Sequence, residues 1–226
     1  MNTTETKTKV MSAEDFVALV MNGTLPQLGD EEIVNVKGDV ILPNTPKQDE
    51  LHLENYLFDG DFVAKHISIK SLFFNHYLEL GMGMGLLTNK SHITGCLNLE
   101  GSTIDTFIAD NVGFGTILLK NTKIYILSMR DSIIGNINMG KCNFTGSFDI
   151  SNTVAESAWF KESQFDAPEP KMSNLTIKGN LYMNEVLFKK YVYCEGMKWG
   201  KIFADRKVVD FIKYSRRGEI CPFATF

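Results

Sequence analysis

The residues of this chain that could carry out chemistry do not form a known catalytic or metal-binding motif. Four histidines are widely separated, whereas zinc motifs place paired ligands a few positions apart: His52, His66, His76 and His92. No Gly-x-Ser-x-Gly elbow, Walker loop or dinucleotide-binding glycine motif occurs. Asp59-Gly60-Asp61 lacks the further oxygen ligands of a calcium loop, so we interpret it as a turn.

Apolar residues recur at every fifth position between residues 97 and 165. The first series is Leu99, Ile104, Ala109, Phe114, Leu119, Ile124, Met129, Ile134, Met139 and Phe144. A second series, two positions earlier, is Leu97, Ser102, Phe107, Val112, Ile117, Thr122, Leu127, Ser132, Ile137 and Cys142. Neither series contains a charged residue. A helix repeats every 3.6 residues and a strand every 2, so a period of five predicts a coil with a corner at every fifth position.

Four such faces make a coil of about 20 residues, so positions one coil apart should stack. Ile104, Ile124 and Phe144 then form one inward column, and Ser102, Thr122 and Cys142 form another. The inward hydroxyls require backbone carbonyl partners, because an unpaired buried hydroxyl costs about 1–3 kcal/mol.

This spacing resembles the pentapeptide-repeat family over roughly residues 53–204, with interruptions. The small residue typical of the family is present on alternate faces, at Ser102, Thr122, Ser132 and Cys142. Asn precedes the central residue at Asn98, Asn138 and Asn143. The resemblance implies a right-handed, four-sided β-helix. It also implies that C-terminal elements cap the helix and join two protomers. Some members of the family act as DNA mimics on type II topoisomerases such as gyrase, so the resemblance makes this role a second hypothesis.

The five-residue period is imperfect towards both ends of the repeat. Leu53, Phe58 and Val63 are followed, after a slip of one position, by Ile69 and Phe74, which would turn Asp61 inward as the partner of Val63. In the last coils we assign Val186/Phe188 and Tyr191/Tyr193 to the inward series.

Charged residues outside the two series also repeat once per coil. Lys120 lies one coil after Glu100, and Arg130 lies one coil after Asp110, so we expect two exposed ion pairs between coils, each contributing about 0–1 kcal/mol. Glu100, Asp105 and Asp110 fall on successive faces and diverge, which argues against paired acid–base catalysis. We therefore expect no enzymatic activity, no metal and no cofactor.

The composition predicts a cytoplasmic protein outside the membrane. The 226 residues contain 44% hydrophobic residues, no apolar run long enough to span a membrane, and four scattered cysteines. Residues 1–170 contain 12 Lys+Arg and 22 Asp+Glu, whereas residues 171–226 contain 11 and 5. This distribution argues against a protein that coats nucleic acid along its length. A partner that docks at one end of the molecule remains compatible with it.

We divide the chain into four segments. Residues 1–11 are expected to be disordered, and residues 12–50 to form a helix, N-capped by Ser12 and ended by Gly23, with an irregular capping segment. Residues 51–204 form the pentapeptide-repeat-like β-helix. Residues 205–226 form a capping helix and tail.

Three stretches are candidate partner contacts. The first is Asp166-Ala167-Pro168-Glu169-Pro170-Lys171, a polar excursion that is either a specificity loop or a tolerated insertion. The second is Gly81 to Gly85, with Met82 and Met84, which is otherwise a corner or bulge. The third is the apolar C-terminus, with Phe223 and Phe226, through which a homodimer is expected.

The sequence therefore favours a non-catalytic intracellular protein-interaction scaffold. The alternative is a DNA mimic that modulates a type II topoisomerase, which a near-continuous acidic stripe along one face would favour. Mixed Lys and Asp columns would count against it. A polysaccharide-active solenoid enzyme is a minor third alternative, and it needs converging carboxylates.

Overall fold

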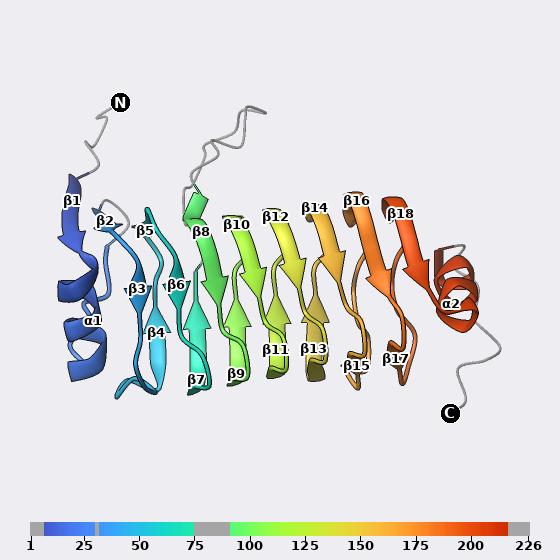
Figure 1. Ribbon diagram of the computed structural model, residues 1–226, viewed down its shortest axis with the longest axis horizontal. Coiled ribbons are helices and arrows are strands. Elements are labelled where there is room, and N and C mark those ends of the chain that lie inside the picture. The colour runs from blue at the N-terminus through green and yellow to red at the C-terminus, as the bar shows by residue number, and fades with distance from the viewer. Residues whose placement is uncertain (1–6, 30–31, 75–90, 217–226) are drawn as a thin grey trace.

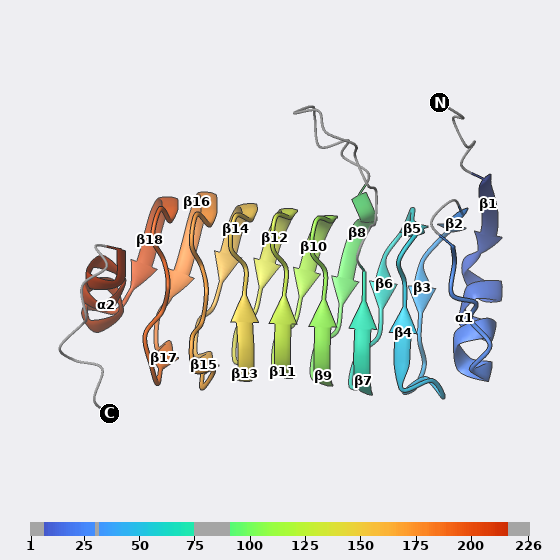
Figure 2. The same cartoon turned by 180° about the vertical axis from the view of Figure 1, so that it is seen from behind.

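The protein is a parallel β-solenoid of about eight turns with one helix at each end (Figure 1). The structure, a computed structural model, describes residues 7–29, 32–74 and 91–216. Over these residues the strands form two parallel sheets, of 11 and 7 strands. Each complete turn contributes to both sheets, and the strands of the smaller sheet stand side by side in the reverse view (Figure 2). The predicted all-β solenoid with helical caps is confirmed.

The larger sheet, sheet A, contains β1 (Lys7–Ser12), β2 (Glu32–Lys37), β3 (Val40–Ile41), β5 (Tyr56–Phe58), β6 (Phe62–Val63), β8 (Ser91–Asn98), β10 (Gly113–Leu118), β12 (Ile133–Asn138), β14 (Val154–Trp159), β16 (Thr176–Met183) and β18 (Lys198–Ala204). The smaller, sheet B, contains β4 (Glu50–His52), β7 (Ser68–Phe73), β9 (Thr103–Ile108), β11 (Lys123–Ser128), β13 (Asn143–Asp149), β15 (Gln164–Phe165) and β17 (Leu187–Phe188). The helices are α1 (Ala13–Asn22) and α2 (Arg206–Arg216).

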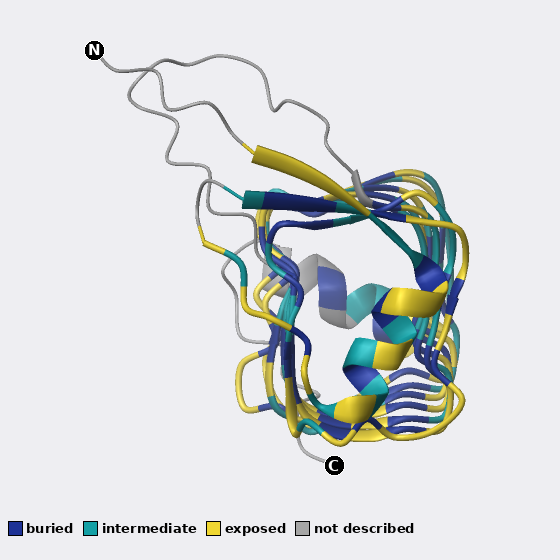
Figure 3. Ribbon diagram, turned by 90° about the vertical axis from the view of Figure 1, so that its left-hand side faces the viewer, coloured by how far each residue is buried: buried dark blue, intermediate teal, exposed yellow. Residues whose placement is uncertain are grey.

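The strand register confirms the stacking that the five-residue period predicts. Ile104 pairs with Ile124, and Ile124 with Phe144, so two successive coils have the same length. The coils lengthen towards the C-terminus, where Ala155 pairs with Ile177 and Ala158 with Leu181. Seen along the axis, the coils superpose on a four-sided outline (Figure 3). The coils therefore share a common outline although their lengths differ.

The interior contains one continuous apolar cluster and a ladder of small polar residues. Each inward hydroxyl donates to a carbonyl of the preceding coil, as Thr122 Oγ1 does to Leu99 O at 3.0 Å and Ser132 Oγ to Ala109 O at 2.9 Å. The thiol of Cys142 donates to Leu119 O at 2.7 Å in the same way. Burial raises the pKa of Cys142 to about 12, so this side chain remains a neutral filler. The expected carbonyl partners are confirmed.

Helix α1 closes the N-terminal end of the interior (Figure 3). Ser12 is its N-cap and accepts from the Asp15 backbone N–H at 3.1 Å, and Gly23 ends it with a left-handed φ of 72°. Phe16 is fully buried and meets the rings of Phe58 and Phe62 edge-on. A solenoid exposes core at its first coil, and α1 covers that surface.

The expectation of disorder through residue 11 is wrong for residues 7–11. These residues form β1, which pairs in parallel with β2 from Lys7↔Glu32 to Ser12↔Lys37. The polar composition misled the prediction, because backbone hydrogen bonds to the edge of β2 and the Lys9–Glu32 ion pair at 2.9 Å order the strand. Residues 1–6 lie outside the described part of the chain.

Helix α2 covers the last coil at the opposite end. Val208 and Ile212 are buried, and the Cys194 thiol donates to Ile212 O at 3.5 Å. No helix in the described ranges is both long and apolar enough to cross a membrane.

A column of glycines, the glycine corner, runs along sheet A where successive coils approach most closely. A Cβ built on each of them would lie 2.1–2.9 Å from a carbonyl oxygen of the preceding coil; they are Gly60, Gly95, Gly115, Gly135, Gly179 and Gly200. Real Cβ atoms essentially never come this close to a non-bonded atom. These six positions therefore require glycine for space, since none of them has a positive φ, whereas β14 has Glu156 at the equivalent position of its coil.

Candidate protein-interaction surface

Ion pairs between neighbouring coils neutralise part of the outer surface. Lys70 pairs with Glu50 at 3.1 Å, Lys141 with Glu162 at 3.2 Å, and Lys178 with Glu156 at 2.6 Å. Acidic and basic residues alternate along the axis in these columns. The charges within the described ranges therefore form mixed columns and not a continuous acidic stripe.

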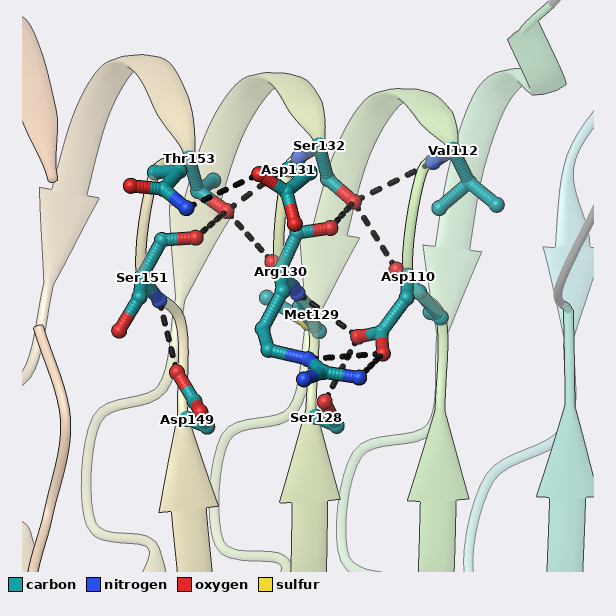
Figure 4. Close-up of polar contacts among 12 residues, drawn as sticks. Asp110, Val112, Ser128, Met129, Arg130, Asp131, Ser132, Asp149, Ser151 and Thr153 are labelled. Atoms are coloured by element: carbon teal, nitrogen blue, oxygen red, sulfur yellow. Dashed lines mark hydrogen bonds and ion pairs between the residues drawn. The ribbon is translucent and has the colours of Figure 1, made fainter. Parts of the chain in front are cut away.

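Asp110 and Arg130 form the pair that the sequence predicts (Figure 4), but the aspartate is not exposed. Its side chain is 9% accessible and accepts from Arg130 Nη2 at 2.6 Å, Arg130 Nε at 2.9 Å and the Arg130 backbone N–H at 2.8 Å. Ser128 Oγ donates a further bond at 2.6 Å. The expected value of about 0–1 kcal/mol for an exposed pair is therefore too low, because a buried carboxylate depends on its donors.

We expect Asp110→Asn to lower the free energy of unfolding by about 1–3 kcal/mol, because the amide accepts fewer of these bonds and loses the charge that Arg130 complements. The measurement is a urea titration followed by circular dichroism. Asp105→Asn, an exposed site on β9, is the control and should shift the midpoint little. Equal midpoints for the two variants would contradict the role of Asp110.

The second predicted ion pair, Glu100 with Lys120, is wrong. The Glu100 carboxylate lies 3.6 Å from Lys65 Nζ in the preceding coil. Lys65 and Lys120 lie in the same column as Glu100, one coil before it and one coil after it. The backbone N–H of His66, next to Lys65, donates to Glu100 O, and the backbone N–H of Gly101, next to Glu100, donates to Lys120 O. An acidic residue in a column has one neighbour in the preceding coil and one in the following coil. The spacing in the sequence does not determine with which of the two it forms an ion pair.

The segment from Asp166 to Lys171 is largely part of the coil and not a free excursion. Ala167 and Pro170 are buried, and the backbone N–H groups of Ala167 and Lys171 donate to Phe144 O and Phe148 O at 2.9 and 2.8 Å. Only Pro168 and Glu169 form the exposed insertion, with Lys171 exposed beside it. Met82, Met84, Phe223 and Phe226 lie outside the described residues.

Three exposed apolar side chains lie in the coil that follows this segment. The stretch from Lys189 to Tyr193 lies directly beside it, since Lys189 pairs with Asp166 at 2.9 Å and Tyr193 forms a parallel bridge with Lys171. Leu187, Tyr191 and Tyr193 are 63%, 45% and 50% exposed. We define the C-terminal apolar surface as Pro168, Glu169, Lys171, Leu187, Tyr191 and Tyr193.

Sequence reasoning missed this surface because it placed Tyr191 and Tyr193 inward. Val192 and Cys194 fill those inward positions, one position further on. The signal was available in the side chains: two tyrosine hydroxyls need partners inside a narrow core, whereas Val and Cys do not.

Asp166 anchors the surface through its charge. Partial burial raises the pKa of this carboxyl, but hydrogen bonds from Lys189 and Gln164 outweigh burial and hold the pKa below its ordinary value. A lowered pKa means that the stabilisation is complete above the pKa of the unfolded chain and is lost as the pH falls through the folded value.

We expect Asp166→Asn to cost about 0.5–1 kcal/mol at pH 7, and the difference from the wild type to vanish in acid. Urea midpoints measured between pH 7 and pH 2 test this. Glu169→Gln, exposed and outside any ion pair in the described ranges, is the control. A difference that persists at pH 2 would show that Asp166 acts through shape and not through charge.

No family model, curated protein or known solved structure matches this chain. Among the described residues, no three His, Cys, Asp or Glu side chains gather in a way that would hold a metal ion. The function proposed below is therefore based on the geometry of the solenoid and of its outer surface.

Proposed function

We propose that this protein is a non-catalytic intracellular scaffold that binds another protein through the C-terminal apolar surface. The observation that carries the proposal is the exposure of Leu187, Tyr191 and Tyr193 in one short stretch beside the Pro168–Glu169 insertion. Tyrosine is enriched at protein interfaces because its ring buries a large area and its hydroxyl stays hydrogen-bonded.

The regular body of the solenoid supports a scaffold function. Ion pairs neutralise several of its charge columns, and the carboxylates that could serve catalysis point to different partners, as Glu100 does to Lys65 and Asp110 to Arg130. Divergent, paired carboxylates favour an interaction module over a polysaccharide-active enzyme.

The mixed charge columns favour the scaffold over a DNA mimic as well. A mimic must present negative charge continuously along one face, whereas Lys65, Arg130 and Lys141 interrupt the acidic columns of this molecule. The homodimer through the C-terminal end remains part of the proposal, with Phe223 and Phe226 as its expected contacts.

A comparison of two surface variants tests the proposal. Immobilised wild-type protein and Leu187→Ser/Tyr193→Ser protein are exposed to host extract, and each captured protein is quantified by mass spectrometry. The control is Tyr125→Ser/Ile133→Ser, which removes two similarly exposed apolar side chains, 56% and 41% accessible, from the middle of the solenoid.

We expect one captured protein to fall at least fivefold with the first variant and to be retained by the control. The purified partner should then bind the wild type and not the variant in solution. Equal capture by all three baits would contradict the proposed surface.

A further inference from the structure

The outer surface of sheet A near its C-terminal end is basic, whereas the chain as a whole is acidic. Strands β14, β16 and β18 together contain a single acidic residue, Glu156, and three lysines, Lys178, Lys198 and Lys201. The whole chain has a net charge of −4, so a basic face is a local departure from its composition.

Within the described part of the chain, two of the three lysines have no neutralising partner. Lys178 is paired with Glu156 at 2.6 Å. Lys198 and Lys201 are exposed, and no carboxylate of the described residues lies within ion-pair distance of either. Their neighbours in the preceding coil are Thr176 and Asn180, which are uncharged.

An aromatic stack borders Lys201. Trp159, Tyr182 and Phe203 occupy one outward column in three successive coils, with ring centroids 5.3 and 4.7 Å apart and interplanar angles of 7° and 8°. Lys201 Nζ lies 5.0 Å from the centroid of Phe203. All three rings are partly exposed, and Tyr182, which is stacked on both faces, can present only its edge to a partner.

We infer that this lysine–aromatic face, made of Trp159, Lys178, Tyr182, Lys198, Lys201 and Phe203, docks an acidic extended segment of a partner protein. The inference rests on the proposed scaffold function and names the chemistry of a second contact. Carboxylates of the segment pair with Lys198 and Lys201, and its apolar side chains lie against the ring edges.

The same features disfavour a nucleic acid as the occupant. Binding of single strands relies on open aromatic faces for base stacking, and in this stack both faces of Tyr182 and one face each of Trp159 and Phe203 are covered by the neighbouring rings. Two available lysines on a chain of net charge −4 also offer little to a long phosphate backbone.

Fluorescence anisotropy with a defined probe tests the inference. The probe is a fluorescein-labelled peptide of four Glu and four Leu in alternation, with the matching Gln–Leu peptide and an eight-nucleotide oligo(dT) as comparison probes. The full-length wild type is compared with Lys198→Gln/Lys201→Gln. The control variant is Lys120→Gln/Lys123→Gln, which removes two exposed lysines with the same spacing from the middle of the solenoid.

We expect the Glu–Leu peptide to bind the wild type, and its affinity to fall about tenfold with Lys198→Gln/Lys201→Gln and less than twofold with the control. The Gln–Leu peptide should bind at least tenfold more weakly. Equal loss in both variants, or tighter binding of oligo(dT) than of the peptide, would overturn the inference. Circular dichroism establishes that each variant is folded, and the single variant Lys198→Gln replaces the double one if it is not.

The outcome is separable from the test of the proposed function. If the peptide does not bind while partner capture still depends on Leu187 and Tyr193, the docking face is wrong and the scaffold proposal stands. If the peptide binds and the Leu187→Ser/Tyr193→Ser variant captures partners normally, the docking face stands and the C-terminal apolar surface is wrong as the main binding site.

Discussion

Phe144→Asp should prevent this protein from folding. Phe144 is fully buried, and its ring centroid lies 4.7 Å from that of Phe148 and 4.9 Å from that of Phe165. Loss of a buried Phe costs about 3–5 kcal/mol, and burial of an unpaired carboxylate adds several more. The sum is comparable to the whole stability of an ordinary domain, about 5–15 kcal/mol.

The measurement is the β-sheet signal in circular dichroism, together with the fraction of protein that remains soluble. Phe144→Leu keeps an apolar side chain and should lose only about 1–3 kcal/mol while it retains the fold. Tyr125→Asp, at a site that is 56% exposed, should be tolerated. A folded Phe144→Asp protein with the wild-type midpoint would show that the inward column is assigned wrongly.

Gly135→Ala should be the most damaging conservative change in the chain. The added Cβ would lie 2.1 Å from Gly115 O, which belongs to the backbone and cannot rotate away. Two coils must separate to admit the methyl group, at a cost of about 3 kcal/mol or more in lengthened hydrogen bonds and packing.

Gly140→Ala is the matched control for this prediction. The nearest atom to its Cβ is Asn138 Oδ1 at 3.4 Å, so the free energy of unfolding should change by less than about 1 kcal/mol. Urea titrations of the two variants measure the difference. Similar midpoints would show that the coils are further apart at the glycine corner than the structure places them.

The sequence predicted the interior well because a narrow core leaves few choices. From residue 97 to residue 144 the two apolar series are buried at the predicted positions, and the register stacks each member on its counterpart in the next coil. Helix α1 and its caps also follow from local chemistry, since Ser12 and Gly23 perform the roles that their side chains allow.

The prediction of the inward positions failed where a coil has one residue more or fewer than the five-residue period requires. The expected slip after Val63 occurs earlier, so Phe62 and Ala64 are buried and Asp61 is at a corner, where its carboxylate accepts from Cys96 N–H at 2.7 Å. The same kind of error hid Tyr191 and Tyr193. A five-residue period has no local marker for an inserted residue, and only the stacking against the neighbouring coil determines where it lies.

The outer surface was the least predictable part. Spacing correctly paired Asp110 with Arg130 but missed the burial of the aspartate, and it paired Glu100 with the wrong lysine. The lysine–aromatic face depends on residues from three different coils, at intervals that vary from coil to coil. No single stretch of sequence contains it.

The order of the coils along the axis also determines how this molecule responds to mechanical force. Each coil, about 21 residues long, is bonded only to the coils before and after it. Tension applied to the chain ends would peel one terminal coil at a time, and each would release a contour length of roughly 70 Å where it had occupied about 5 Å of the axis. The solenoid would therefore lengthen in repeated steps, as an extensible tether does, while its remaining coils keep their surfaces.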